Sequence, residues 1–416
     1  MADNAPVASM SLLPNRPLPW LGAVLVVGFV IALATRSVEA IQVEHRVAQL
    51  AGQMKPVCVG RLLIDLPEGA RHEFSQARIA GFNLATMEET PTEFKARLDE
   101  RQAQLMPTVA TPGRVNHLEL VRAVKNRHGV AGRILVHGRR VVTGQALAGA
   151  TGKRLRRDLR QEVVTIEALV HGNGVSIDLT ADLTADLTAD LSEREAIGRL
   201  STLIAGLVPN PKNIIPFEPG FCMDRAYLRG PQAPGRDEDI MMTAWHGSRP
   251  EIALTLMHAR GTGADRSGLL TRSTGPKART PSDTGARVSV QLARLRSIGG
   301  LAGAEVVEEY VQPDAATFYN FWWEMNGSKD KEPAPHVALT MFTGGSPQVS
   351  DLPPLSQAMA YGLWDKVVHS VRLRADDSAK STQAGLPQAG SHRSALAETG
   401  CDGSGASQCA VRSSPS

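Results

Sequence analysis

The alternation of apolar and polar positions predicts short strands in two blocks of the chain. In the first block strands are expected at 56–67, 77–87, 132–137, 162–171 and 174–179. In the second block they are expected at 221–228, 239–245, 251–258, 304–311, 317–325 and 336–342. The strands follow one another in the manner of hairpins, and helices stand near the block ends. This order favours an α+β fold with antiparallel sheets over a doubly wound parallel sheet.

Helices are expected where apolar residues recur at helical spacing behind a capping residue. Thr90 and Glu93 have the spacing of a capping box, so a helix is predicted from there to about Leu105. Further helices are expected after Ser192, ending before Pro209, and at 355–371. The segment 291–301 is also predicted to be helical.

The two blocks repeat one plan when the chain is shifted on itself by 164 positions. Cys58 then coincides with Cys222, and Arg61 with Arg225. Self-similarity at a fixed offset indicates repeated structural units. The sequence therefore predicts two similar domains, at 55–209 and 217–374, each an antiparallel sheet with packed helices.

The two ends of the chain differ in composition from these domains. Segment 18–36 holds an apolar run with arginines at its flanks, after a short segment at 1–17 that is cytoplasmic or the n-region of a signal. It is predicted to be an uncleaved membrane anchor or, alternatively, a cleaved signal peptide. Either places the domains outside the cytoplasm. Segment 375–416 is rich in Ser, Ala and Gly and is predicted to be a disordered tail.

Composition excludes several classes of protein. The 45 Lys and Arg residues against 42 Asp and Glu leave a net charge of +3, too small for a histone-like nucleic-acid binder. Four cysteines in 416 residues exclude a small scaffold held together by disulfides. We therefore expect no nucleic-acid partner.

The sequence carries none of four common motifs for catalysis, nucleotide binding or metal binding. The sequence lacks G-x-S-x-G, the phosphate loop G-x-x-x-x-G-K-[ST], H-E-x-x-H and paired C-x-x-C. The acidic repeat that begins at Asp178 lacks the alternating ligands and turn glycine of a calcium loop. We predict no catalytic residue, no cofactor and no metal site, and we expect a protein that is not an enzyme.

Two groups of residues are candidates for linking the halves or for binding a partner. Cys58 and Cys222 open the two halves, and in an oxidising compartment they could form a disulfide; two separate buried thiols are the alternative. Arg154, Arg156 and Arg157 form the strongest local positive charge. They are either a solvated face or a docking patch for an acidic protein or an anionic lipid headgroup.

The segment 318–323 is the densest aromatic cluster in the sequence. As a strand it directs Phe318, Asn320 and Trp322 to one face and the intervening side chains to the other. One face is expected to pack as core. Aromatic side chains that point outward would be candidate partner contacts, and we name Tyr319, Phe321 and Trp323, with core packing as the alternative.

The order of four short segments resembles a known family. These are Cys58–Pro67, Phe221–Asp224, Phe321–Glu324 and Pro335–Gly344. Together they are similar to immunity proteins that neutralise a class-4 lipase effector of the bacterial type VI secretion system. The resemblance covers residues 55 to 374. It implies a two-domain α+β clamp in the periplasm that binds the lipase tightly and keeps substrate from its serine.

The predicted function is that of a periplasmic immunity protein, anchored in the inner membrane, with a cognate phospholipase effector as partner. Two alternatives stay open at this point. One is an envelope-anchored hydrolase with an unrecognised active site. The other is an envelope module that binds anionic lipid through 153–160.

Overall fold

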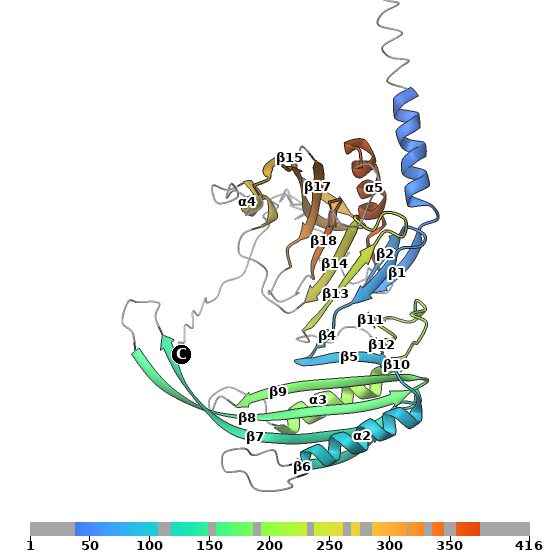
Figure 1. Cartoon of the computed structure of the whole chain (residues 1–416). Coiled ribbons are helices and arrows are strands. Elements are labelled where there is room, and N and C mark those ends of the chain that lie inside the picture. The colour runs from blue at the N-terminus through green and yellow to red at the C-terminus, as the bar shows by residue number, and fades with distance from the viewer. Residues whose placement is uncertain are drawn as a thin grey trace, which may run out of the picture.

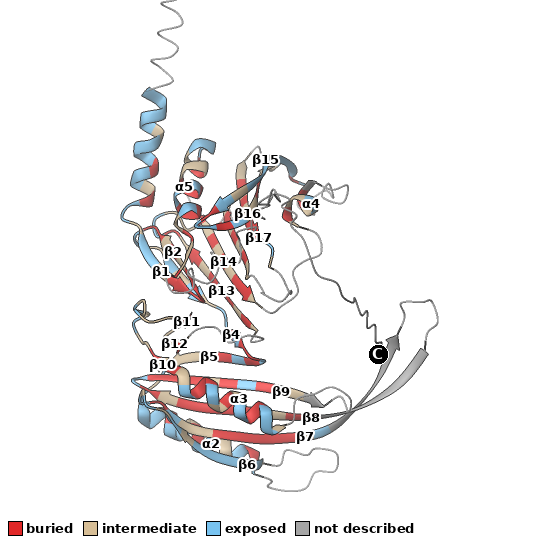
Figure 2. Ribbon diagram, turned by 180° about the vertical axis from the view of Figure 1, so that it is seen from behind, coloured by how far each residue is buried: buried red, intermediate tan, exposed pale blue. Residues whose placement is uncertain are grey.

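The computed structural model describes residues 38–106, 118–148, 155–185, 193–230, 237–260, 268–274, 285–313, 316–327, 335–344 and 355–374. The predicted segments 1–17, 18–36 and 375–416 lie outside the described residues. Among the described residues, no helix is long and apolar enough to cross a membrane. The first described helix, at 38–51, is mostly exposed (Figure 2) and contacts the rest of the protein through buried Val47 and Ala51.

The elements of the first half are, in chain order, β1 (Lys55–Val59), β2 (Leu62–Leu66), β3 (Arg71–Phe74), β4 (Ala77–Ile79), β5 (Phe82–Glu88), α2 (Pro91–Leu105), β6 (Leu118–Lys125), β7 (Ala131–Ala148), β8 (Leu155–Gly172), β9 (Val175–Ala185), α3 (Glu193–Gly206) and β10 (Leu207–Pro209). Those of the second half are β11 (Gly220–Met223), β12 (Ala226–Arg229), β13 (Glu238–Trp245), β14 (Ala253–Arg260), α4 (Leu269–Thr274), β15 (Arg287–Ile298), β16 (Leu301–Val311), β17 (Thr317–Met325), β18 (His336–Phe342), α5 (Gln357–Ser370) and β19 (Arg372–Leu373).

Most strands of both halves belong to one continuous antiparallel sheet (Figure 1). The prediction of antiparallel pairing is confirmed, but the prediction of a separate sheet in each half is wrong. The sheets join where β4 pairs with β13, at Ile79–Glu238 and Arg78–Asp239. Because β4 has three residues, it pairs with only part of β13, and the remaining backbone groups of β13 need other partners. β3 pairs with β13 at Met242–Trp245.

The strand order shows that the two halves repeat one plan. It reads β15-β16-β17-β18-β14-β13-β4-β5-β9-β8-β7-β6. Counted inward from either end of the sheet, the strands of the two halves correspond one to one, from β15 and β6 at the edges to β13 and β4 at the centre. The helices correspond too, since α3 and α5 each precede the closing strand of their half. The offset of 164 positions that relates Glu193–Gly206 to Gln357–Ser370 is the one seen in the sequence.

The hairpins that open the halves are exchanged between them. The hairpin β1–β2 pairs with β19, the last strand of the second half, and β11–β12 pairs with β10, the last strand of the first half. Each hairpin was predicted as one uninterrupted strand. Gly60 and Arg225 have positive φ values of 59° and 49°, and they turn the chain in the middle of each predicted strand.

Helices lie on both faces of the sheet. Residues of α3 and α5 join the large core cluster, which includes residues of both halves. On the other face, α2 covers Leu135 and Leu169 with Phe94 and Leu98. The sheet therefore separates two helical layers, and α2 and α4 share one of them.

The segment predicted as a helix at 291–301 belongs instead to β15, the hairpin turn and the start of β16. Leu292, Leu295 and Ile298 are spaced three apart, which imitates a helical face. In the structure Leu295 is 80% exposed and Ile298 is buried, because β15 pairs with β16 along its length. Gly299 and Gly300, both with positive φ, form the turn, and this pair is a hairpin signal that the helical spacing obscured.

Candidate functional site

A disulfide and a backbone bridge join the two opening hairpins. Cys58 and Cys222 are bonded, with their Cα atoms 5.8 Å apart. The Gly60 N–H donates to the Cys222 carbonyl at 2.9 Å, and the Cys222 N–H donates back at 2.8 Å. A Cβ atom on Gly60 would lie 2.9 Å from His258 Nδ1, so the close approach requires glycine.

The ion pair Arg61–Glu238 lies beside this bridge and is almost fully buried. The two side chains are 3% and 0% exposed. Arg61 donates from Nε and from Nη2 to the two carboxylate oxygens, each at 2.7 Å. Because Arg61 follows β1 and Glu238 begins β13, this bidentate pair connects the exchanged hairpin to the central sheet.

His258 is buried on β14 beside the same bridge. Its ring is tilted by 60° to that of Phe221, with 5.9 Å between the ring centroids, and its Nδ1 atom has no hydrogen-bond partner among the described residues. Burial lowers the pKa of His258 to about 3, and the positive charges of Arg61 and Arg260 act in the same direction. The ring is therefore neutral in the folded protein at neutral pH.

We expect His258 to make stability depend on pH below about 6.5. Between pH 6.5 and 3 the unfolded chain binds a proton that the folded chain excludes, so the free energy of unfolding falls as pH falls. The contribution is at most about 1.4 kcal/mol per pH unit. Urea unfolding at pH 7.5, 6.5 and 5.5 should show a flatter dependence for His258→Leu than for wild type. Parallel curves would contradict the assignment.

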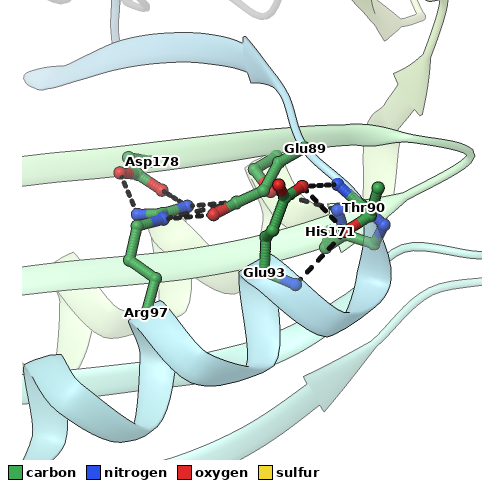
Figure 3. Close-up of polar contacts among 7 residues, drawn as sticks. Glu89, Thr90, Glu93, Arg97, His171 and Asp178 are labelled. Atoms are coloured by element: carbon green, nitrogen blue, oxygen red, sulfur yellow. Dashed lines mark hydrogen bonds and ion pairs between the residues drawn. The ribbon is translucent and has the colours of Figure 1, made fainter.

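A network of polar side chains connects α2 to the sheet (Figure 3). Arg97 donates to both oxygens of Glu89, at 3.0 Å each, and to both oxygens of Asp178, at 2.7 and 3.1 Å. Glu89 also accepts a short hydrogen bond from Ser176, whose hydroxyl lies 3.0 Å from His171 Nδ1. The network therefore ties α2 to β8 and β9 through charge-assisted hydrogen bonds.

The start of α2 places Arg97 in this network. Thr90 accepts from the Glu93 N–H at 3.3 Å, and Glu93 accepts from the Thr90 N–H at 2.8 Å, which completes the predicted capping box (Figure 3). One turn later Arg97 lies over the ring of Phe94, 5.7 Å from its centroid. The cap thus sets the register that aims Arg97 at the sheet.

The electrostatics of the network indicate a structural role. The hydrogen bond from Arg97 is the main cause that lowers the pKa of Glu89. Burial raises the pKa of Asp178 against the opposing effect of Arg97, and burial lowers the pKa of His171. In a nucleophilic triad the histidine stands between serine and carboxylate, whereas here Ser176 stands between Glu89 and His171. Glu89 therefore contacts the serine rather than the histidine, so it cannot orient His171 as the acid of a triad does.

A shallow cavity beside the network does not resemble a small-molecule site. Its volume is about 340 Å³, and its lining includes Arg97, Arg101, Glu167 and Asp178. Sites for small ligands are lined mainly by apolar side chains, unlike this one. The described residues also contain no cluster of His, Cys, Asp or Glu that could bind a metal ion.

The second half repeats the contact between a helix and a buried carboxylate. Arg101 of α2 donates to Glu167 of β8 at 2.8 Å, and Arg272 of α4 donates to Glu324 of β17. Burial raises the pKa of each carboxyl, but hydrogen bonds from a histidine and the arginine outweigh it, so both pKa values are lowered. The same pair at equivalent strands in both halves favours a role in folding over a role in catalysis.

The aromatic strand packs as core on the side named as candidate contacts. Tyr319, Phe321 and Trp323 are 5%, 0% and 0% exposed. Phe321 stacks on Trp364 of α5 at 5.4 Å and meets Tyr361 edge-on at 5.1 Å. Their assignment as partner contacts is therefore wrong, because α5 covers them. Of the alternatives given by the sequence, core packing applies.

Comparison with family models gives two matches along the chain. The N-terminal domain of Tle cognate immunity protein 4 matches residues 55–148, and its C-terminal domain matches residues 214–376. The chain belongs to the Tle cognate immunity protein 4 family. The family comprises immunity proteins to type VI secretion lipases rather than enzymes. No curated protein matches the chain.

Solved structures share the fold of this chain. The apo immunity protein TplEi of the type VI secretion system of Pseudomonas aeruginosa is 22% identical, with a TM-score of 0.58, over 77% of this chain and 97% of that one. The structure described as the Tle4–Tli4 complex is 20% identical, with a TM-score of 0.59, over 78% and 98%. TplEi complexed with an "L" peptide is 20% identical, with a TM-score of 0.56, over 78% and 99%.

The structure describes only part of the remaining candidate partner contacts, the three arginines. Arg154 lies outside the described residues. Arg156 and Arg157 belong to β8, opposite Leu147 and Ala146 of β7, but their side chains are not described. Their role as a docking patch stays a prediction.

Side chains that sequence reasoning did not select lie on the other face of the aromatic strand. Phe318, Asn320 and Trp322 are half-buried, and none of them faces α5. Alternation had already separated this set from its neighbours. The sequence carries no signal for which face α5 covers, so the outward set could be found only from the structure.

Proposed function

We propose that this chain is a periplasmic immunity protein that binds a type VI secretion phospholipase effector and blocks its access to substrate. The observation that carries the proposal is the match to both domains of Tle cognate immunity protein 4. The fold shared with the protein in the Tle4–Tli4 complex supports binding to a lipase effector.

The geometry supports occlusion as the mechanism. An inhibitor of this kind needs a rigid, complementary surface with buried anchors and a polar rim. The continuous sheet, the disulfide Cys58–Cys222 and the buried pair Arg61–Glu238 hold the two halves in one arrangement. Such preorganisation lowers the entropy lost on binding, which favours a tight complex.

The proposed location is the periplasm, with an anchor in the inner membrane. A disulfide between the halves suits an oxidising compartment. The apolar segment 18–36 would supply the anchor or export signal. A toxin that attacks phospholipid from the periplasmic side would be met in that compartment.

Titration of the purified full chain into the phospholipase encoded beside its gene should abolish activity at a one-to-one ratio. The two proteins should also co-elute from a sizing column. In cells that export the lipase to the periplasm, the full chain should restore growth, whereas a chain without residues 1–36 should not, although it still inhibits the purified lipase.

Unchanged activity at tenfold excess, with no complex on the column, would contradict the function. Equal protection by both chains in cells would contradict the location alone. The same chain unfolded by heat serves as the control for nonspecific effects of added protein on the lipid substrate.

A further inference from the structure

Among the described residues, one face of the sheet in the second half carries no helix where the first half carries α2. The 15-residue helix α2 covers that face in the first half, but its counterpart α4 has six residues and contacts mainly β15 and β16. Among the described residues, no helix covers this face of β13, β14, β18 and β17 (Figure 1). We call this face, together with Glu308 and Tyr310 of the adjacent β16, the open face; it comprises Met241, Thr243, Trp245, Ala253, Thr255, Met257, Glu308, Tyr310, Phe318, Asn320, Trp322, Ala338, Thr340 and Phe342.

The strand register gathers large apolar side chains on the open face. Trp245 stands opposite Ala253, which stands opposite Phe342, so both aromatic rings lie in one row across three strands. Phe318 stacks on Tyr310 at 5.0 Å and meets Phe342 edge-on at 5.1 Å. These five residues are all half-buried, so each leaves part of its side chain accessible from solvent. Such surfaces on soluble proteins mark interaction sites.

Within this aromatic surface lies a carboxylate that has no cationic partner in the part of the chain that the structure describes. Glu308 accepts from the Tyr310 hydroxyl at 2.9 Å and from Asn320 Nδ2 at 3.5 Å. Among the described residues Glu308 forms no ion pair, whereas nearby Glu324 is paired with Arg272. Burial and Glu308 raise the pKa of Tyr310 to about 12, so Tyr310 remains a neutral donor to the carboxylate. A negative charge held in this way is complementary to a basic side chain on a partner.

The combination fits the entrance of a phospholipase active site. An apolar entrance favours the admission of acyl chains, and a basic group there would bind the phosphate that the substrate carries. An aromatic surface with one fixed carboxylate complements both features. We propose that the open face covers the active-site entrance of the lipase, with Glu308 paired to a basic side chain there. This inference rests on the proposed function.

Binding of variants to the lipase tests the surface. Trp322→Ala should weaken binding about 30-fold or more, as expected for loss of a central aromatic anchor. Glu308→Lys should weaken it by a similar factor and slow association, because two positive charges would then meet. Met241→Lys, at a position that is 40% exposed, places a charge on the face with little effect on the core.

Phe217→Ala provides the matched control. Phe217 is a fully exposed aromatic residue in the linker between β10 and β11, outside the sheet, so its removal should leave binding unchanged. Circular dichroism and thermal melting establish that each variant is folded. If Trp322→Ala is not folded, Met241→Lys and Glu308→Lys decide the question.

Three results would overturn the proposal. The first is wild-type inhibition by all three open-face variants. The second is loss of binding by Phe217→Ala alone, which would place the interface at the linker. The third is a dimer of this chain that Trp322→Ala converts to a monomer while inhibition persists, which would assign the face to self-association. Failure of the wild-type chain itself to inhibit would instead reject the proposed function.

Discussion

Replacement of Arg61 with alanine is expected to lower the free energy of unfolding by about 3–5 kcal/mol. The substitution leaves the carboxylate of Glu238, which is 0% exposed, without the two charge-assisted hydrogen bonds of 2.7 Å that it now accepts. An uncompensated buried charge costs more than the pair itself contributes, because the desolvation of Glu238 remains. Urea unfolding monitored by tryptophan fluorescence measures the change.

A neighbouring exposed pair gives the control for this prediction. Arg78 is 59% exposed, and its Nε atom lies 3.9 Å from Asp237. Arg78→Ala should cost less than about 1 kcal/mol, because water screens the pair. The double variant Arg61→Met/Glu238→Leu should be more stable than Arg61→Ala, since it removes both charges. Equal effects of Arg61→Ala and Arg78→Ala would show that the buried pair is not a major contributor to stability.

The second large effect on stability is expected from removal of the disulfide. Cys58 and Cys222 are 164 positions apart, so reduction frees a long loop in the unfolded chain. The loop-entropy relation gives about 5 kcal/mol for a loop of this length, as an upper estimate. Cys58→Ser/Cys222→Ser should therefore melt well below the oxidised wild type in a thermal scan.

Dithiothreitol separates the bond from the substitution. It should lower the melting temperature of the wild type towards that of the double serine variant and leave that variant unchanged. Because Gly60 and Cys222 also exchange two backbone hydrogen bonds, the reduced protein should remain folded at 25 °C. A wild type that melts at the same temperature with and without dithiothreitol would contradict a stabilising bridge.

Local signals predicted the elements that depend on neighbouring residues. The capping box of Thr90 and Glu93 begins α2, and Ser356 caps α5, as their side-chain chemistry requires. Strict alternation identified strands such as β18, whose burial pattern alternates at every residue. The offset of 164 positions also predicted two halves with one plan, because duplication preserves the order of elements.

Long-range pairing decided what those signals left open. Gly60 turns the chain within a predicted strand, so that β1 and β2 form a hairpin that pairs with β19 of the other half. Nothing local distinguishes that partner from β10, since both closing strands follow equivalent helices. Hydrogen bonds along an edge strand depend on which strand the fold brings beside it.

The open face was likewise determined partly by the sequence and partly by the tertiary structure. By itself, the sequence determined the family, the period of the strands, and the division of the aromatic strand into one set with Phe318 and Trp322 and another with Tyr319 and Trp323. Only the tertiary structure decided that α5 covers the second set and that α4 is too short to cover the first. Alternation defines two faces of a strand, but the packing of helices distant in sequence determines which face is buried.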